Sequence, residues 1–206
     1  MSSFEDTTDE TTRRIFSSLS TGLTATLIVS LLGAVSIRAM TTRLGASAFG
    51  IFILVQAFVG LVQTFTDLGL SPVLQRDVAR GDQDERTLLG YAMGLRLTLA
   101  LIAIPVGAAI GLLVYAHRSS TMKVGLVLLL CSIPFAVTQE VSAAHFTARL
   151  RNTIIAVGSV LQQVVFVGLV ILAVGLHKSI VYCLGAALTG AIVASIYTNV
   201  MARREI

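Results

Sequence analysis

Continuous apolar blocks, each about 20 residues long, constrain the fold of this chain more than any other feature. At a rise of 1.5 Å per residue, about 20 residues cross a hydrocarbon core of roughly 30 Å. The blocks do not alternate with period two, as the strands of a membrane β-barrel do. The sequence therefore predicts an all-α, polytopic membrane bundle of about six transmembrane helices, at about 18–39, 49–66, 88–115, 124–147, 153–175 and 179–200.

The low charge content supports this class and leaves no room for a soluble domain. Only 13% of the 206 residues are charged and 55% are apolar, whereas a soluble domain carries about 25% charged residues. The longest polar connection, about 67–87, is too short to bury a core of its own. A short interfacial helix ended by Gly81 is expected within it. We therefore expect one transmembrane helical domain over residues 1–206.

The distribution of positive charge predicts the orientation of the chain. Lys and Arg favour the cytoplasmic side of short loops, and one set of connections is richer in them: Arg13, Arg14, Arg76, Arg80, Arg86, Arg149, Arg151, Arg203 and Arg204. The opposite loops hold only Arg43, Arg118, Lys123 and Lys178. We expect a multi-pass protein of the plasma (inner) membrane with both termini cytoplasmic, residues 1–17 forming a cytoplasmic tail and residues 67–87 a cytoplasmic loop.

The net charge of +4 is interpreted as an attraction to anionic membrane lipids. The arginines are dispersed, with no basic run or aromatic platform beside them, so nucleic acid is not an expected partner. Motifs for ATP binding, for zinc and for a serine nucleophile are absent. Cys131 and Cys183 lie within predicted spans at no zinc or redox spacing. The sequence predicts no enzyme, no cofactor, no metal and no catalytic residue.

Two charges lie deep inside predicted spans. Arg96 shares a helix face with small residues, and Glu140 does the same in the next span; the small residues are Ala92, Ala100, Ala103, Gly107 and Gly111 beside Arg96, and Ala136, Ala143 and Ala144 beside Glu140. Arg96 lies about 12 Å and Glu140 about 10 Å from the same membrane side. We therefore predict that the two side chains face each other or share a polar cavity.

Two interpretations of this predicted pair stay open. A buried ion pair that only fixes the register of two helices is common, since intramembrane charges usually pair. Alternatively, the pair borders a polar cavity that binds an anion or relays a proton. Further polar residues favour an interior that is wet on the cytoplasmic side, among them Thr21 and Thr24 in the first span, a stripe of Thr138, Ser142, His145 and Arg149 in the fourth, and Gln162 and Gln163 in the fifth.

A family resemblance rests on residues 42–80, TRLGASAFGIFILVQAFVGLVQTFTDLGLSPVLQRDVAR. The segment resembles the start of the Wzx-type polysaccharide-biosynthesis flippases of the multidrug/oligosaccharidyl-lipid/polysaccharide transporter superfamily. In those proteins an Arg-Leu-Gly turn followed by Phe-Gly ends the first helix, and an Asp-Leu-Gly-Leu turn ends the second. The matching positions are Arg43, Leu44, Gly45, Phe49, Gly50, Asp67, Leu68, Gly69, Leu70 and Arg76. Gly45 and Gly69 permit tight turns, and Asp67 can cap or pair.

The resemblance implies a transporter that flips a polyprenyl-pyrophosphate-linked oligosaccharide by alternating access between two six-helix lobes. Arginines of a central cavity meet the pyrophosphate in such proteins. The candidate substrate-binding residues are then Arg38, Arg43, Arg76 and Arg96, although Arg38 could instead snorkel to water. The pair of Arg96 and Glu140 is a candidate structural or gating element.

A full member of that family is about twice as long as this chain. This chain therefore corresponds to one of the two lobes. The chain is therefore expected either to be a truncated fragment or to need a second six-helix half or another copy of itself. The expected partners are a lipid-linked oligosaccharide and membrane lipids. An alternative function is a nontransporting membrane scaffold of a glycan-assembly complex.

Overall fold

A computed structural model describes residues 2–67, 69–80, 85–148 and 151–205. The first helix, α1 (Ser2–Asp67), is two helices joined at Gly45, whose backbone is not helical (φ 84°, ψ 162°). It is followed by the short α2 (Leu70–Arg80), the long α3 (Glu85–Val114), α4 (Ser120–Leu130), α5 (Ile133–Ala148), α6 (Asn152–Gly175) and α7 (Ile180–Glu205). The predicted all-α bundle is confirmed.

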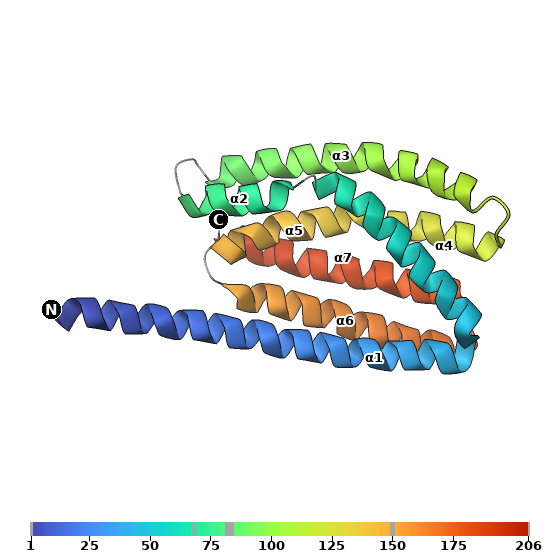
Figure 1. Ribbon diagram of the computed structural model, residues 1–206, viewed down its shortest axis with the longest axis horizontal. Coiled ribbons are helices and arrows are strands. Elements are labelled where there is room, and N and C mark those ends of the chain that lie inside the picture. Colours follow the sequence, from blue (N-terminus) through green and yellow to red (C-terminus); the bar gives the residue numbers. More distant parts are fainter. Residues whose placement is uncertain (1, 68, 81–84, 149–150, 206) are drawn as a thin grey trace.

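Most of the helices run roughly along one common direction, so the molecule has two ends, while the part of α1 after Gly45 crosses the others obliquely (Figure 1). One end carries the junction of α2 with α3 and that of α5 with α6. The other end, which we call the kink end, carries the corner at Gly45, the α3–α4 loop and the α6–α7 loop. Between the two ends, α6 packs against α1 and α7, and α5 packs against α7, α3 and α2.

Five helical stretches of the described chain are long and apolar enough to cross a membrane. The first, Ser20–Asp67, has 48 residues and contains both of the first two predicted spans, which Gly45 divides. The third to sixth predicted spans correspond to α3, to α4 with α5, to α6 and to α7. The expected number of about six spans is therefore consistent with the structure, although the connection predicted between 39 and 49 is almost entirely helical.

Two glycines with left-handed backbone make the tight corners that the sequence predicted. Gly45 has φ 84° and Gly69 has φ 77°, a region that costs other L-residues about 1 kcal/mol or more. The prolines differ in effect. Pro105 lies inside an unbroken α3. Pro134 lies in the first turn of α5, just after the break between α4 and α5, where a proline is tolerated because the N–H that it lacks would have no partner within the helix.

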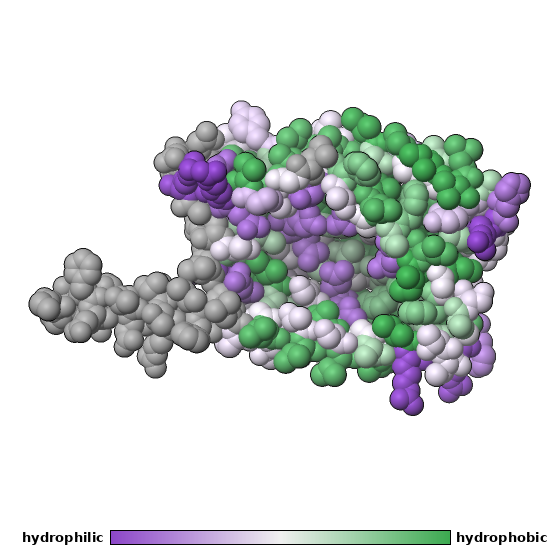
Figure 2. All heavy atoms as spheres, in the orientation of Figure 1, coloured by the Kyte–Doolittle hydropathy of each residue, from purple (hydrophilic) through white to green (hydrophobic). Residues whose placement is uncertain are grey.

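At Gly107, the small-residue face of α3 packs closely against α1. A Cβ atom added at Gly107 would lie 2.8 Å from Cγ2 of Val62, so only glycine allows this approach. The opposite face of α3 is apolar and exposed, with Leu101 and Leu113 about three-quarters exposed. Apolar side chains cover much of the surface in Figure 2, as expected of helices that face lipid.

The connection at 67–87 differs from a simple loop. Most of it is α2, the short helix expected there, and α2 packs against α5 and α3. Leu74 of α2 is buried in a small apolar cluster with Leu89, Val141 and Ala144. The expected stop at Gly81 falls outside the described residues, as does Arg149. Likewise, the tail expected at 1–17 is helical from Ser2 onward and continues directly into α1.

Candidate functional site

Arg96 of α3 lies at the centre of a charged network that joins four helices. Its guanidinium Nη2 forms ion pairs with Oε2 of Glu140 on α5 and, at 3.0 Å, with Oδ1 of Asp67 at the end of α1. Its Nη1 donates a longer hydrogen bond, 3.4 Å, to Oγ of Ser71 on α2. The structure thus brings Arg96 and Glu140 into contact, as their similar predicted depths in the membrane led us to expect.

Asp67 also fixes the start of α2. Its Oδ1 accepts hydrogen bonds from the backbone N–H of Ser71, at 3.2 Å, and from the Ser71 hydroxyl, at 2.7 Å. A carboxylate at this position satisfies donors that the first turn of a helix leaves unpaired. Because Gly69 lies between them in a left-handed conformation, this short segment is a corner held by side chains.

The two carboxylates and the guanidinium differ in exposure. The Arg96 side chain is 1% exposed, whereas that of Asp67 is 33% and that of Glu140 is 39% exposed. Gln63 of α1 donates a hydrogen bond of 2.8 Å to Oε1 of Glu140. The carboxylates therefore form the open side of the network, and the arginine its closed side.

This arrangement offsets the cost of placing a charge in a membrane span. A buried guanidinium is tolerated when it is paired and hydrogen-bonded, and Arg96 meets two carboxylates and one hydroxyl. Its Nε is the one guanidinium nitrogen without a partner among the described residues. With two negative charges against one positive, the network does not offer Arg96 to an anionic ligand in this conformation.

A cavity of about 240 Å³ lies between α1, α6 and α7. Its polar lining comes from Ser36, Gln56, Gln162 and Gln163. The Ser36 hydroxyl bonds to its own helix at Leu32 O, but the three glutamine amides form no hydrogen bond with other described residues. Gln56 precedes Gln63 by seven residues, two helical turns, so the cavity and the charged network lie along one face of α1.

Figure 2 shows polar side chains gathered in a hollow at the middle of the visible face, framed by apolar surface above and below. A polar hollow inside an apolar bundle is typical of a site that water or a polar ligand enters. Gln162 and Gln163 line the cavity between α1, α6 and α7, and the expectation of an interior that is wet on the cytoplasmic side stays a prediction.

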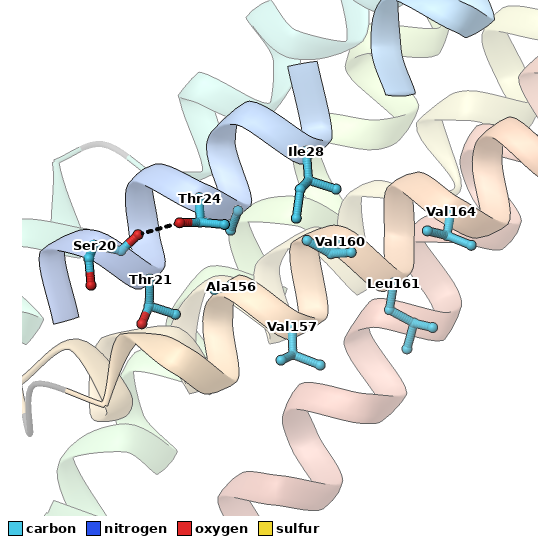
Figure 3. A pocket seen from close by; sticks show the side chains of 10 residues that line it. Ser20, Thr21, Thr24, Ile28, Ala156, Val157, Val160, Leu161 and Val164 are labelled. Carbon is cyan, nitrogen blue, oxygen red and sulfur yellow. Dashed lines mark hydrogen bonds between the residues drawn. The ribbon is translucent and has the colours of Figure 1, made fainter. Parts of the chain in front are cut away.

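A second cavity, of about 500 Å³, lies between α1 and α6 nearer the N-terminus. Figure 3 shows Ser20, Thr21 and Thr24 at one end and apolar side chains such as Val160 over the rest. Thr24 Oγ1 donates to the backbone carbonyl of Ser20 at 2.8 Å, so this hydroxyl is satisfied within its own helix. The threonines of the first span therefore line a mainly apolar groove.

The polar stripe of the fourth span packs against α7. Thr138 and Ser195 share a hydrogen bond of 2.7 Å between their hydroxyls. Ser142 donates to the side chain of Asn199 at 2.9 Å. His145 is fully buried at the same face. These contacts are ordinary interhelical hydrogen bonds, and they make the stripe a packing surface.

Comparison with known families decides the class of this bundle. Residues 17–206 match the family described as "Polysaccharide biosynthesis protein". The chain belongs to this family. The resemblance seen at residues 42–80 is thereby confirmed, since this is the family of the Wzx-type flippases. No curated protein and no solved structure matches the chain.

This polysaccharide biosynthesis protein is a multi-pass membrane protein by its apolar helices and by its family. The four arginines expected to bind substrate do not meet in one place. Arg38 and Arg43 line a cavity at the kink end, Arg96 lies in the charged network, and Arg76 is exposed on α2 at the opposite end (Figure 1).

Two members of the network, Gln63 and Ser71, were not predicted from the sequence. Asp67 was predicted to cap or pair and does both, but Arg96 was not predicted as its partner. Asp67 and Ser71 were assigned to the loop outside the span, and Gln63 was read as part of an apolar block. The spacing of Gln63 and Asp67 carried a signal, because side chains four apart on one helix share a face. A tight turn at Gly69 was expected, but the sequence did not indicate that this turn keeps Ser71 within reach of Asp67.

Proposed function

We propose that this chain is a transport lobe that flips a polyprenyl-pyrophosphate-linked oligosaccharide across the membrane during polysaccharide biosynthesis. The observation that carries the proposal is the cavity lined by Gln56, Gln162 and Gln163, whose amides have no partner among the described residues. A carboxamide both donates and accepts hydrogen bonds and so matches the hydroxyl groups of a sugar. Family membership over residues 17–206 supports the same function.

In this proposal the Arg96 network is a gate and not the pyrophosphate site. It ties α1 and α2 to α3 and α5 at the corner around Gly69, where a change of helix direction is cheapest. A pyrophosphate needs donors that are not already neutralised, and Arg38, Arg43 and Arg76 fit that description better than Arg96. Further donors come from the second half.

We further propose that the lobe works with a second six-helix half or with another copy of itself, both termini being cytoplasmic. The two halves rock about the hollow to expose it to each side in turn. The sequence contains no ATP-binding motif, so an ion gradient or substrate exchange drives the cycle. The chain acts as a transporter and not as an enzyme.

The test is performed in a strain that lacks its own oligosaccharide flippase. This chain is expressed together with the C-terminal six-helix half of that flippase, and oligosaccharide reaching the outer leaflet is measured. The variant Gln56→Leu with Gln163→Leu is expected to lower translocation at least about tenfold at an unchanged protein level, since two hydrogen bonds are lost. The control Thr98→Val changes an exposed residue of α3 and is expected to have no effect.

The scaffold alternative gives the opposite pattern. A scaffold would retain its glycan-assembly partners in a pull-down and would show no translocation in any combination. If the chain does not restore translocation, or if the double glutamine variant transports as well as the wild type, the proposed function is wrong.

A further inference from the structure

The cavity lined by Gln56, Gln162 and Gln163, which we call the glutamine cavity, lies at the elbow of α1. The arm of α1 before Gly45 forms one wall, the arm after Gly45 a second and α6 a third. Its volume is about 240 Å³, below the roughly 300–1,000 Å³ of pockets that enclose drug-sized ligands. The space therefore suits one sugar ring and not a chain of several.

Two phenylalanine rings close the glutamine cavity on one side. Phe52 of α1 and Phe166 of α6 line the cavity and stack with their centroids 5.9 Å apart and 24° between their planes. On α1, Gln56 follows Phe52 by one turn, and on α6, Gln162 precedes Phe166 by one turn. Because α1 leaves the kink end after Gly45 whereas α6 runs toward it (Figure 1), both phenylalanines lie nearer the kink end than the glutamines. The cavity thus has an aromatic floor on that side, with amides above it.

The surroundings of the amides leave them open to a ligand. Gln56 is exposed, Gln162 and Gln163 are half-buried, and none of them forms a hydrogen bond with another described residue. The residue opposite Gln163 is Gly33, where an added Cβ would lie 3.6 Å from Nε2 of the amide, so a larger side chain there would cover the amide. Three carboxamides supply both donors and acceptors, which is the combination that hydroxyl groups need.

None of the described residues that line the glutamine cavity is charged. A carboxylate placed in the cavity would lose water without gaining a counter-charge, at a cost of several kcal/mol. An uncharged sugar loses much less, because the amides replace hydrogen bonds that its hydroxyl groups make with water. The cavity therefore favours an uncharged ligand, in contrast to the Arg96 network and to the cations of the kink end.

We propose that the glutamine cavity is a specificity subsite for one uncharged sugar ring and that it excludes acidic sugars such as uronic acids. The flat face of C–H groups of a pyranose lies on the pair of Phe52 and Phe166, and its hydroxyl groups bond to Gln56, Gln162 and Gln163. The inference rests on the proposed function, which supplies the glycan as ligand. The charge class and the size of the sugar come from the cavity itself.

The experiment measures binding to the purified full chain in detergent by native mass spectrometry, with probes that share farnesyl pyrophosphate as an anchor. Two pairs of linked sugars are compared, glucose with glucuronic acid and galactose with galacturonic acid. The members of each pair differ only in a hydroxymethyl or a carboxylate group at one ring carbon. Farnesyl pyrophosphate without a sugar is the anchor control. In at least one pair we expect the uncharged sugar to bind about tenfold more tightly than the acidic sugar and than the bare anchor.

A reversal of specificity separates a subsite from a merely structural role. Gln163→Arg places a cation in the cavity and is expected to reverse the preference, so that the acidic sugar binds more tightly than the uncharged one. Phe166→Leu removes one flat ring and is expected to weaken binding of the uncharged sugar about fivefold while leaving that of the bare anchor unchanged. The control Thr98→Val changes an exposed residue of α3 and is expected to alter none of these constants. The comparison of sugars in the wild type holds without any variant.

Two outcomes would overturn the inference. One is binding of both acidic sugars at least as tightly as their uncharged counterparts. The other is equal binding of all four sugars and the bare anchor, which would mean that the cavity takes no sugar. Failure of the proposed function looks different, since uncharged sugars would then be preferred although no oligosaccharide is flipped in the deficient strain. If instead translocation requires the glutamines but the sugars bind equally, the function holds and the inference is wrong.

Discussion

The arginines of this lobe occupy two contrasting environments. Arg96 is buried among Asp67, Glu140 and Ser71, and its charge is more than balanced by side chains of the same chain. Arg38 and Arg43 are exposed at the kink end, where the sequence supplies no carboxylate at all. A charge balanced within the fold serves the fold, whereas a charge without an internal partner is available to a ligand.

The contrast predicts that the two regions respond very differently to loss of charge. In Asp67→Asn with Glu140→Gln, Arg96 stays buried without a counter-charge. We expect the free energy of unfolding to fall by about 3 kcal/mol or more, because breaking a buried pair on one side leaves an uncompensated ion. The thermal midpoint in detergent measures this effect.

The matched control removes two charges at the kink end, in Arg38→Gln with Arg43→Gln. Both side chains are exposed, so the thermal midpoint of the lipid-free protein is expected to stay within experimental error of the wild type. Equal midpoints for the two double variants would mean that the Arg96 network does not support the fold.

A charge swap tests whether the network is a simple pair. In Arg96→Glu with Glu140→Arg, the carboxylate introduced on α3 would face Asp67, whose Oδ1 lies 3.0 Å from the present guanidinium. Because the two carboxylates repel each other, we expect the free energy of unfolding of the swapped variant to stay about 2 kcal/mol below that of the wild type. Addition of Asp67→Asn is expected to recover most of it. Full recovery by the swap alone would exclude a role for Asp67.

Gln63 and Gln56 lie two turns apart on one face of α1 and provide a smaller test. Gln63→Leu removes the hydrogen bond of 2.8 Å to Glu140 and is expected to lower the free energy of unfolding by about 1 kcal/mol. Gln56→Leu removes an amide that has no partner among the described residues, so it is expected to leave the thermal midpoint unchanged or slightly raised. A larger loss in Gln56→Leu would contradict the assignment of that amide to ligand contacts.

The smallest expected effect concerns the backbone of the kink end. His177→Gly relieves a left-handed residue other than glycine and is expected to stabilise the protein by about 0.5 kcal/mol. Gly45→Ala places a Cβ on left-handed backbone and is expected to destabilise it, although no atom lies within 4 Å of that position. Opposite shifts of the thermal midpoint confirm the strain, and shifts of the same sign contradict it.

Much of the fold could be predicted from hydropathy, because span length and helix periodicity are local properties. The depth argument also placed Arg96 beside Glu140, since two antiparallel neighbours of similar depth must come level. The third partner, Asp67, was not predicted to join them, because the block at 49–66 stops just before it and was taken to end at the membrane surface. In the structure the chain turns sharply at Gly69, so Asp67 stays within the helix bundle and reaches Arg96.

The candidate site was less predictable than the fold for a related reason. Four arginines were grouped by chemistry alone, but their positions depend on how the helices bend and pack. The corner at Gly45 carries Arg43 to the kink end, and α2 carries Arg76 to the other end. The glutamines were visible in the sequence, yet their convergence on one cavity depends on α1 and α6 packing side by side.

The contrast between the two environments can be measured in one sample. Phenylglyoxal modifies guanidinium groups that reach solvent, and peptide mass spectrometry reports each arginine separately. In the detergent-solubilised protein we expect Arg38 and Arg43 to be modified at least about tenfold faster than Arg96, which is expected to react only after denaturation. Modification of Arg96 at the rate of Arg38 in the folded protein would contradict the account.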